Sequence, residues 1–510
     1  MSYKQAIINE NTNAADNVAF TANGAVSNAS SLNFLVDLFA ILGAVRGKDF
    51  STFETLFEQA YSMNRKLTLQ MVLWLRDVRG GAGERETTRQ ILRHLEANHQ
   101  DDIHEIIPVL AEYGRWDDLL IFTNPQVKID AYRTIEAHLR NGNALCAKWM
   151  PRVYKLKKSK DGTVNKESVA NKNRIANNTI ARELMQVMNI NERQYRKLLA
   201  SLSTTVEQNM CAKDWSTIEY SHVPSVAMNR YRAAFMRNDE TRFTEFGQKV
   251  ESGEVKVNAS ALFPYDITTK FKYGESDKVL VGQWDALPDY LNGASILPMC
   301  DTSGSMECGA GTSGSLTCMD VAVSLSLYIS DKQKGAFKDV FLTFSESPQM
   351  FVLKGKNVEE KYRDLCKYKG GQYWGGSTDI GKAFHHILKT AVKQNVPQED
   401  MPEYLLIFSD MEFDATYSWG GGENNGNWDV TAYEYAKQLY AQNGYELPKV
   451  IFWNLNGRPG NNPVTINDTG TAMVSGFSPA VLTAILAGEQ VDPVSIMLAA
   501  IDKPRYQVIA

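Results

Sequence analysis

Five side chains that could act as oxygen ligands occur in three separate stretches of the sequence. In ILPMCDTSGSM, residues 296–306, an apolar run ends at Asp301, and Ser303 and Ser305 follow at alternate positions. WGGSTDIGKAF places Thr378 just before a helical pattern, and EYLLIFSD ends another apolar run at Asp410. Carboxylate and hydroxyl oxygens suit Mg²⁺, with Mn²⁺ and Ca²⁺ as alternatives, whereas Zn²⁺ prefers His and Cys. These residues predict a divalent metal site, although Asp, Ser and Thr are also ordinary residues of a turn after a strand.

The elements around these residues alternate between strand and helix. Apolar runs rich in β-branched and aromatic residues predict strands at SILPMC, KDVFLTF, MFVL, EYLLIFS, PKVIFWNL and TAMVSG. Helical patterns lie between them at CMDVAVSLSLYISDKQ, DIGKAFHHILKTAVKQ, VTAYEYAKQLYAQ and SPAVLTAILAGE. This alternation predicts a doubly wound, mostly parallel sheet with helices on both faces. Ligands of such sheets bind outside the carboxyl ends of the strands, which is where Asp301 and Asp410 fall.

The first half of the chain has a different pattern, so the predicted fold class is α + α/β. Apolar residues recur at helical spacing over 31–251, which predicts an irregular α-helical repeat (HEAT-like) domain or a bundle. Residues 1–30 are rich in Asn, Ala and Ser, and we expect a flexible arm. Residues 252–294 mix Pro, Gly and short apolar runs and are predicted to connect the halves. The sheet domain is predicted over 295–510.

The composition is that of a globular protein in a reducing compartment. Of 510 residues, 44% are hydrophobic and the net charge is −5, so the chain as a whole lacks the basic character of many nucleic-acid-binding proteins. Its six cysteines form no CxxC pair, which argues against a disulfide framework and a zinc ribbon. The sequence has neither the apolar core of a signal peptide nor a transmembrane segment. We therefore expect a cytoplasmic protein without a membrane partner, and the sequence leaves its oligomeric state open.

A basic tract between residues 148 and 197 stands out in this acidic protein. Only Asp161, Glu167, Glu183 and Glu192 oppose the positive charges, and Trp149, Tyr154 and Tyr195 are interleaved with them. Cationic groups next to aromatic rings can bind phosphates and stack on bases, so the tract predicts an RNA-binding face. The alternative is a solvated loop, because LKKSKDGTVNKES has a flexible composition. The candidate RNA-binding residues are Lys148, Arg152, Lys155, Lys157, Lys158, Lys160, Lys172, Arg174, Arg196 and Lys197.

The sequence shows no pattern typical of an enzyme. It contains no Ser-His-Asp spacing and no reactive cysteine in a recognisable setting. RGGAGERE, residues 79–86, lacks the Lys-Ser ending of a phosphate-binding loop, so we interpret it as a turn between helices. We therefore predict a non-enzymatic binding protein, since no positioned general base accompanies the metal ligands.

The order DTSGSM, a glycine-flanked Thr and an apolar strand ending in SD resembles the metal-ion-dependent adhesion site of von Willebrand factor A domains. The resemblance implies that Ser303, Ser305 and Thr378 touch the metal directly and that Asp301 and Asp410 act largely through water and hydrogen bonds. It also implies a protein partner that supplies an acidic residue to the remaining coordination position. In the third stretch, the neighbouring acids Glu412 and Asp414 compete with Asp410 for this role.

A helical-repeat half followed by an A domain also resembles the Ro (TROVE-domain) RNA-binding proteins, although Ro-type repeat motifs are absent. A less characterised family of the same layout, found in plants, bacteria and large viruses or phages, is more similar in sequence. The similar segments are LRDVRGGAGERE, KWMPR, YRKLLASLSTTVEQNM, WSTIEYSHVPSVAMNRY and SDMEFD. The resemblance implies a Ro-like scaffold that binds a small structured RNA. The alternative is a protein–protein adaptor or a structural component, for instance of a virion or an ATPase-associated complex, that uses the metal site without RNA.

Overall fold

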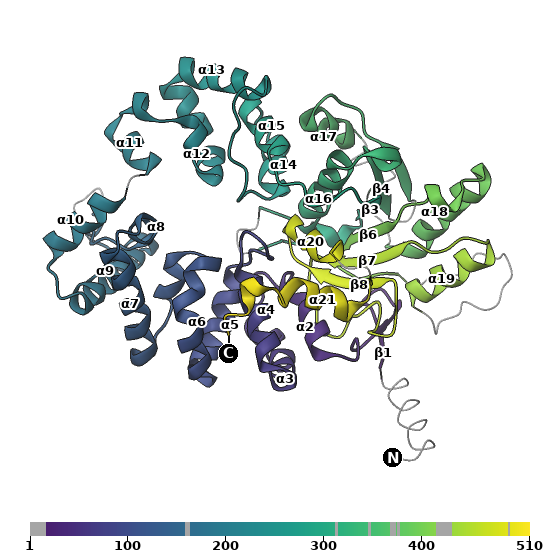
Figure 1. The fold of residues 1–510 in the computed structure, drawn as a ribbon, viewed down its shortest axis with the longest axis horizontal. Helices are drawn as coiled ribbons and strands as arrows, with labels where there is room; N and C mark the ends of the chain where they lie inside the picture. The colour runs from purple at the N-terminus through teal and green to yellow at the C-terminus, as the bar shows by residue number, and fades with distance from the viewer. Residues whose placement is uncertain are drawn as a thin grey trace, which may run out of the picture. The chain divides into compact units, whose positions relative to one another are not determined.

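The computed structural model describes residues 17–158, 164–203, 205–311, 315–344, 348–367, 374, 378–414, 431–487 and 490–509. The chain forms two compact units (Figure 1). The sheet unit comprises Met1–Thr87, Tyr220–Met236 and Glu240–Gln507, and the helical unit comprises Thr88–Glu219, Arg237–Asp239 and Val508–Ala510. None of the described helices is both long and apolar enough to cross a bilayer.

The sheet unit contains the predicted doubly wound sheet. Its six strands lie in the order β5-β4-β3-β6-β7-β8, and every neighbouring pair is parallel except β4 and β5. The two central strands, β3 and β6, are buried along their whole length, which explains why they are apolar at almost every position. The strands are β3 (Ile296–Asp301), β4 (Val340–Phe344), β5 (Gln349–Val352), β6 (Tyr404–Ser409), β7 (Lys449–Asn454) and β8 (Thr471–Ser475).

The helices predicted between the strands are confirmed, and two more were not predicted. The predicted ones are α16 (Cys318–Lys332), α18 (Ile380–Gln394), α19 (Ala432–Gln442) and α20 (Leu482–Ile485); the others are α17 (Val358–Cys366) and α21 (Pro493–Ile501). The start of α16 is fixed by a capping box, in which the Thr317 hydroxyl accepts a hydrogen bond from the Asp320 N–H and the Asp320 carboxylate accepts one from the Thr317 N–H. This box fixes where the helix begins, after the loop that follows Asp301, Ser303 and Ser305.

The N-terminal part of the chain differs from the prediction. Residues 17–30, expected to lie in a flexible arm, form a hairpin of β1 (Val18–Phe20) and β2 (Val26–Asn28). The hairpin is held by contacts remote in sequence: the Asn28 N–H donates to the Asn462 carbonyl over 2.9 Å, and the Asn462 N–H donates back. Such long-range pairing leaves no local pattern in the sequence. Residues 1–16 of the expected arm lie outside the described residues.

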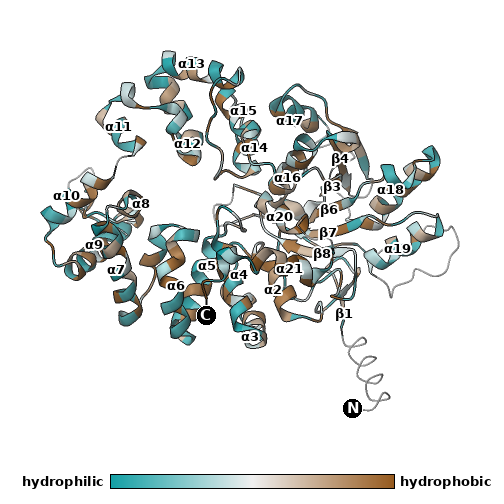
Figure 2. Cartoon of the chain, in the orientation of Figure 1, coloured by the Kyte–Doolittle hydropathy of each residue, from teal (hydrophilic) through white to brown (hydrophobic). Residues whose placement is uncertain are grey.

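The first helices also belong to the sheet unit rather than to a helical-repeat domain starting at residue 31. They are α2 (Phe34–Leu42), α3 (Glu54–Met63) and α4 (Arg65–Arg76). Figure 2 shows α2 and α21 brown along most of their length, and both pack against β8. A Cβ atom on Gly43 would lie 2.5 Å from the Ser475 carbonyl oxygen, so the glycine permits this close approach. The helical-repeat prediction was wrong for α2 because this helix is apolar on nearly every side. Such a helix needs other elements packed around it on every side, and the sheet unit provides them.

The predicted connecting segment, 252–294, contains two helices and packs within the sheet unit. It contains α14 (Pro264–Lys272) and α15 (Lys278–Asp285), and it follows α12 (Ser225–Asn238) and α13 (Glu240–Glu251). The Trp284 indole N–H donates to Asp331 over 2.7 Å, and the Lys272 ammonium donates to Asp320 over 2.8 Å. The segment is therefore part of a folded unit and not a linker.

The helical unit is a series of amphipathic helices in which each packs on its neighbours. Contacts join α6 to α7, α7 to α8 and α9, and α10 to α8 and α9. No regular repeat is needed for this packing, which agrees with the irregular spacing in the sequence. The helices are α5 (Glu86–Asn98), α6 (Gln100–Tyr113), α7 (Pro125–Arg140), α8 (Ala144–Trp149), α9 (Val169–Val187), α10 (Glu192–Leu202) and α11 (Val206–Ala212).

Candidate metal centre

The Asp301 carboxylate lies at the carboxyl end of β3 and is fully buried. One of its oxygens, Oδ1, accepts a hydrogen bond from the Ser303 N–H over 2.9 Å, and the other, Oδ2, accepts one from the Ser409 hydroxyl over 2.6 Å. The Ser303 and Ser305 hydroxyl oxygens are 3.0 Å apart. The alternating serines therefore converge beside the aspartate, as the sequence predicts.

The Asp410 carboxylate follows the adjacent strand, β6, and is also buried. Met411 adopts a φ of 64°, a left-handed conformation that turns the chain sharply after Asp410, and its N–H donates to the Ser409 hydroxyl over 3.0 Å. The Asp410 Oδ1 atom receives the Glu412 N–H over 3.4 Å. The Oδ2 atom is buried without a hydrogen-bond partner among the described residues. A buried carboxylate oxygen without a partner is unfavourable unless a cation or a proton neutralises it.

The raised pKa values of Asp301 and Asp410 agree with the need for a neutralising cation or proton at this site. Burial, and then repulsion from Asp410, raises the pKa of Asp301 to about 7 against the stabilising hydrogen bonds from Ser409 and Ser303. Burial also raises the pKa of Asp410, and the nearby Ser305 side chain partly offsets it. Two buried carboxylates that both resist ionisation form a site in which a divalent cation would restore the charged forms. The oxygen donor set fits Mg²⁺.

The structure distinguishes the three acids that compete in the third stretch. The Glu412 carboxylate accepts hydrogen bonds from Arg458 over 2.7 Å and from the Ala22 N–H over 2.6 Å, so it is already neutralised by groups outside the site. The Asp414 carboxylate accepts the Thr378 N–H over 2.5 Å. Of these three acids, Asp410 is therefore the one that interacts with Asp301 and Ser305.

Thr378 is buried and held next to the Asp410 loop by its backbone. Its N–H donates to the Asp414 carboxylate, and its carbonyl accepts the Asp414 N–H over 3.0 Å. The glycine pair that precedes it, 375–376, lies outside the described residues. The structure thus places Asp301, Ser303, Ser305 and Asp410 beside one another, through the contacts of Asp301 with Ser303, Ser303 with Ser305 and Asp410 with Ser305. Thr378 bonds to Asp414, four residues after Asp410.

Two family models together match nearly the whole chain. A model described as "Domain of unknown function (DUF2828)" matches residues 21–122 and 125–296. The chain belongs to the DUF2828 family. A second model, "Domain of unknown function (DUF7788)", matches residues 295–503 and so begins at β3. The von Willebrand factor A and Ro resemblances stay predictions.

One relative has a similar length and comes from a large virus. "Uncharacterized protein L728" of Acanthamoeba polyphaga mimivirus is 26% identical over 534 residues, which cover 94% of this chain and 87% of that protein. The DUF2828 chain is therefore similar over nearly its whole length to a viral protein, as the predicted resemblance to a family that includes viral members implies.

The basic tract of this DUF2828 protein contains a backbone clamp. Asn178 accepts the Tyr154 N–H and donates to the Tyr154 carbonyl, both over 2.9 Å, and Asn171 does the same for Lys157 over 2.7 and 3.0 Å. The two asparagines are seven residues apart on α9, about 10.5 Å, and the two clamped residues are three apart in an extended chain, about 10 Å. The matched spacing holds the Pro151–Lys158 segment extended along α9.

The ten predicted RNA-binding residues fall into distinct groups. Lys148, Lys172 and Arg196 form ion pairs with Glu207, Glu167 and Glu192. Arg152 donates to the Ser203 hydroxyl over 3.5 Å, and Arg174 donates to the Lys155 carbonyl. Within the described residues, Lys155, Lys157, Lys158 and Lys197 have no ion pair, and Lys160 lies outside the described residues.

Only part of the aromatic set is available for stacking. Tyr195 is buried, and its hydroxyl donates to the Pro151 carbonyl over 3.0 Å, so it supports the clamped segment. The Arg115 guanidinium lies 3.9 Å from the Trp149 ring centroid and covers it. Tyr154 is 49% exposed and lines a cavity of about 330 Å³ beside α10. The remaining lining residues are Arg152, Val153, Lys155, Glu192, Tyr195 and Arg196.

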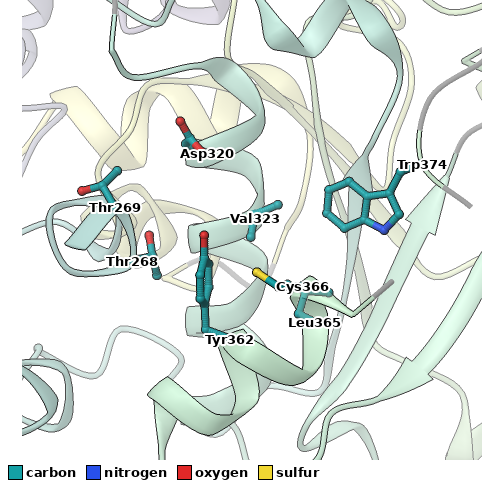
Figure 3. A pocket seen from close by; sticks show the side chains of 8 residues that line it. All are labelled: Thr268, Thr269, Asp320, Val323, Tyr362, Leu365, Cys366 and Trp374. Carbon is teal, nitrogen blue, oxygen red and sulfur yellow. The ribbon is translucent and has the colours of Figure 1, made fainter. Parts of the chain in front are cut away.

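Two other features of the DUF2828 chain carry no ligand site. RGGAGERE is a packed turn, because a Cβ on Gly81 would lie 2.0 Å from the Trp74 carbonyl oxygen and the Glu84 carboxylate is held by Arg46. The hollow in Figure 3 has a volume of about 10 Å³, which is room for one water molecule. Its lining residues are Thr268 and Thr269 on α14, Asp320 and Val323 on α16, Tyr362, Leu365 and Cys366 on α17, and Trp374.

Proposed function

We propose that the sheet unit is a non-enzymatic, metal-dependent binding module. The residues that would hold the cation, Mg²⁺ first, are Asp301, Ser303, Ser305, Thr378 and Asp410. The observation that carries this proposal is the buried Asp410 Oδ2 atom, which has no hydrogen-bond partner among the described residues and lies next to a second buried carboxylate whose pKa is raised. The bound cation would supply the positive charge that these groups lack.

The same residues suggest how a partner would be recognised. Asp301 and Asp410 are buried, whereas Ser305 is exposed, so access to the site is from the Ser305 side. Mg²⁺ usually keeps several waters in its shell, so two carboxylates and three hydroxyls, some of them acting through water, leave a coordination position to a ligand. A carboxylate from a protein partner would complete the shell, which agrees with the resemblance to the adhesion site of von Willebrand factor A domains. Catalysis is not proposed, because no free general base lies beside these ligands in the described residues.

The test is a metal titration with a matched pair of variants. Calorimetry with Mn²⁺ and Mg²⁺ should show binding to the wild type, loss of binding in Asp410→Asn, and unchanged binding in Glu412→Gln, because the Glu412 side chain already bonds to Arg458 and Ala22. Equal loss in both variants would refute the specific role of Asp410. A pulldown from host extract with Mg²⁺ or EDTA would then test the acidic partner.

We propose RNA binding as a second function, located on the helical unit. The specific observation is the clamped segment, which holds Lys155, Lys157 and Lys158 on an exposed, extended backbone without ion pairs among the described residues. An extended row of cations matches the repeating phosphates of RNA, and the half-exposed Tyr154 offers a stacking surface. The Ro-like layout supports a small structured RNA as the ligand.

Copurifying nucleic acid tests this second function. The protein would be purified from its host at moderate salt, its 260/280 nm absorbance ratio recorded, and any bound nucleic acid sequenced. A discrete small RNA released as salt rises would support the proposal. A clean protein spectrum, together with failure to bind added RNA at low salt, would refute it and favour the adaptor or structural component that uses the metal site alone.

A further inference from the structure

Two cysteines bracket the loop that leads from the metal site to α16. The Cys308 and Cys318 sulfur atoms are 3.3 Å apart. The Cys318 N–H donates to the Cys308 carbonyl over 3.0 Å, and the adjacent residues Gly309 and Thr317 form an antiparallel bridge. The two cysteines are therefore neighbours across a short antiparallel ladder and not a chance contact of long side chains.

The ladder places the two backbones at the spacing of a disulfide. One backbone hydrogen bond, from the Cys318 N–H to the Cys308 carbonyl, joins the two residues, and the Cys308 N–H donates to the Ser305 carbonyl instead. Opposite Cα atoms in antiparallel ladders are about 4.5–5.5 Å apart. Disulfide-bonded residues have Cα atoms about 4.4–6.8 Å apart. The sulfur atoms need to close from 3.3 Å to about 2.05 Å, which side-chain rotation and a small backbone shift can supply.

The environments of the two thiols differ in the way that oxidation requires. Cys308 is partly exposed; its thiol donates to the Cys318 sulfur over 3.3 Å, and its sulfur accepts the Asn456 side-chain N–H over 3.5 Å. Cys318 is buried, and its thiol donates to the Leu455 carbonyl over 3.3 Å. An accessible thiol next to a protected one is the arrangement of an attacking and a resolving cysteine.

We propose that Cys308 and Cys318 are a dithiol modification site, which a peroxide converts into an intramolecular disulfide. The Cys308 thiolate attacks a peroxide oxygen, the O–O bond breaks, and the leaving hydroxide takes a proton to form water. The Cys318 thiol then attacks the resulting sulfenic acid, the S–S bond forms, the S–O bond breaks, and a second water leaves. Two thiols lose two electrons and two protons, and hydrogen peroxide is reduced to two waters.

The disulfide would act on the metal site, and this step rests on the proposed metal-binding function. Cys308 ends the short 3-10 helix Gly304–Glu307, which contains Ser305. Drawing Cys308 toward α16 moves this turn and with it a metal ligand. Disturbing groups that position metal ligands commonly costs 10–100-fold in affinity, so we expect the oxidised protein to bind Mn²⁺ about tenfold more weakly.

Mass spectrometry of the full-length protein tests the modification site. The reduced protein is treated with hydrogen peroxide, its remaining thiols are alkylated, and the peptides are analysed. We expect a Cys308–Cys318 linkage with the loss of two hydrogens, reversed by dithiothreitol and absent in Cys318→Ser. The exposed Cys211 and Cys366 report whether the oxidant acted. Oxidised Cys211 together with fully alkylated Cys308 and Cys318 would overturn the proposal.

Calorimetry with Mn²⁺, after removal of peroxide, separates the two proposals. Weaker binding by the oxidised wild type, with no effect of oxidant on a Cys308→Ser/Cys318→Ser double variant, is the expected result. Equal affinity of reduced and oxidised wild type would overturn the coupling but leave the metal site intact. No binding by the reduced wild type would refute the metal function, while the disulfide would still be detected by mass.

Discussion

Replacing Asp301 by Asn should stabilise the metal-free protein at neutral pH while weakening the proposed metal binding. Burial and Asp410 raise the pKa of Asp301 from 3.8 to about 7. The folded protein therefore binds this proton more tightly than the unfolded chain does. Its contribution to stability is fully present below pH 3.8 and is lost as the pH rises through about 7. Asparagine has a similar shape and carries no charge, so it escapes this loss.

The size of the effect follows from the shift. A difference of about 3 pKa units corresponds to about 4 kcal/mol. The amide NH₂ cannot accept the hydrogen bond that the Ser409 hydroxyl gives to Asp301 Oδ2, which costs about 1 kcal/mol. The net gain at pH 8 is therefore about 3 kcal/mol. For a unit of this size, that gain corresponds to an increase of about 4 °C in the unfolding midpoint.

Thermal unfolding of the wild type and the Asp301→Asn variant at pH 5 and pH 8, with EDTA or with Mg²⁺, measures this effect. At pH 5 in EDTA the two proteins should have similar midpoints, and at pH 8 the variant should unfold at the higher temperature. Mg²⁺ should raise the midpoint of the wild type only, because a ligand that binds the folded state stabilises it by mass action. The control is the Glu412→Gln variant, which should respond to Mg²⁺ as the wild type does.

Two results would refute this reasoning. A wild-type–variant difference that stays constant between pH 5 and pH 8 would show that Asp301 is ionised throughout and not repelled by Asp410. An equal rise of both midpoints with Mg²⁺ would place the cation elsewhere.

Three further predictions concern the clamp, the basic segment and the acid outside the metal site. Asn178→Ala removes two hydrogen bonds and should destabilise the helical unit by about 2 kcal/mol, with faster amide exchange in the clamped segment; an unchanged exchange rate would contradict the clamp. Charge reversal of Lys155, Lys157 and Lys158 should weaken RNA binding and reduce the slope of log K against log salt by about 2 in filter-binding assays; an unaltered slope would move the interface elsewhere. Glu412→Gln should lower the unfolding temperature by weakening the bond to Arg458, yet keep Mn²⁺ affinity within about twofold in calorimetry; a larger loss of affinity would make Glu412 a ligand.

Much of the arrangement of the candidate metal centre could be predicted because parallel strands end at a common edge. The apolar runs that end at Asp301 and Asp410 form adjacent strands, β3 and β6, so their carboxylates had to meet. Sequence reasoning missed Ser409, although the last letter of the EYLLIFS run showed a hydroxyl at the strand end. Its role depends on the pairing of two strands more than 100 residues apart, which no local pattern encodes.

The N-terminal part could not be predicted for the same physical reason. The hairpin at residues 17–30 pairs with Asn462, and α2 packs against β8, so both depend on partners that lie more than 400 residues away in the sequence. Their composition carries only weak information: an Asn- and Ser-rich segment is typical of a loop whether or not it is held in place. In the basic tract, the positive charges were evident from the sequence. The role of the two asparagines that clamp it was not, because they look like ordinary polar residues of a helix.

The packing of α2 against β8 also affects how the chain is made. The Ser475 hydroxyl donates to the Phe39 carbonyl over 2.8 Å, so a helix synthesised near the start of translation is completed by a strand synthesised near its end. At roughly 5–20 residues per second, about 20–90 s separate the emergence of the two elements from the ribosome. During that interval α2, apolar on nearly every side, has no sheet to cover it. The nascent chain therefore exposes an apolar sequence that chaperones can bind until β8 arrives, whereas the main segment of the helical unit, Thr88–Glu219, is contiguous in sequence and needs no such wait.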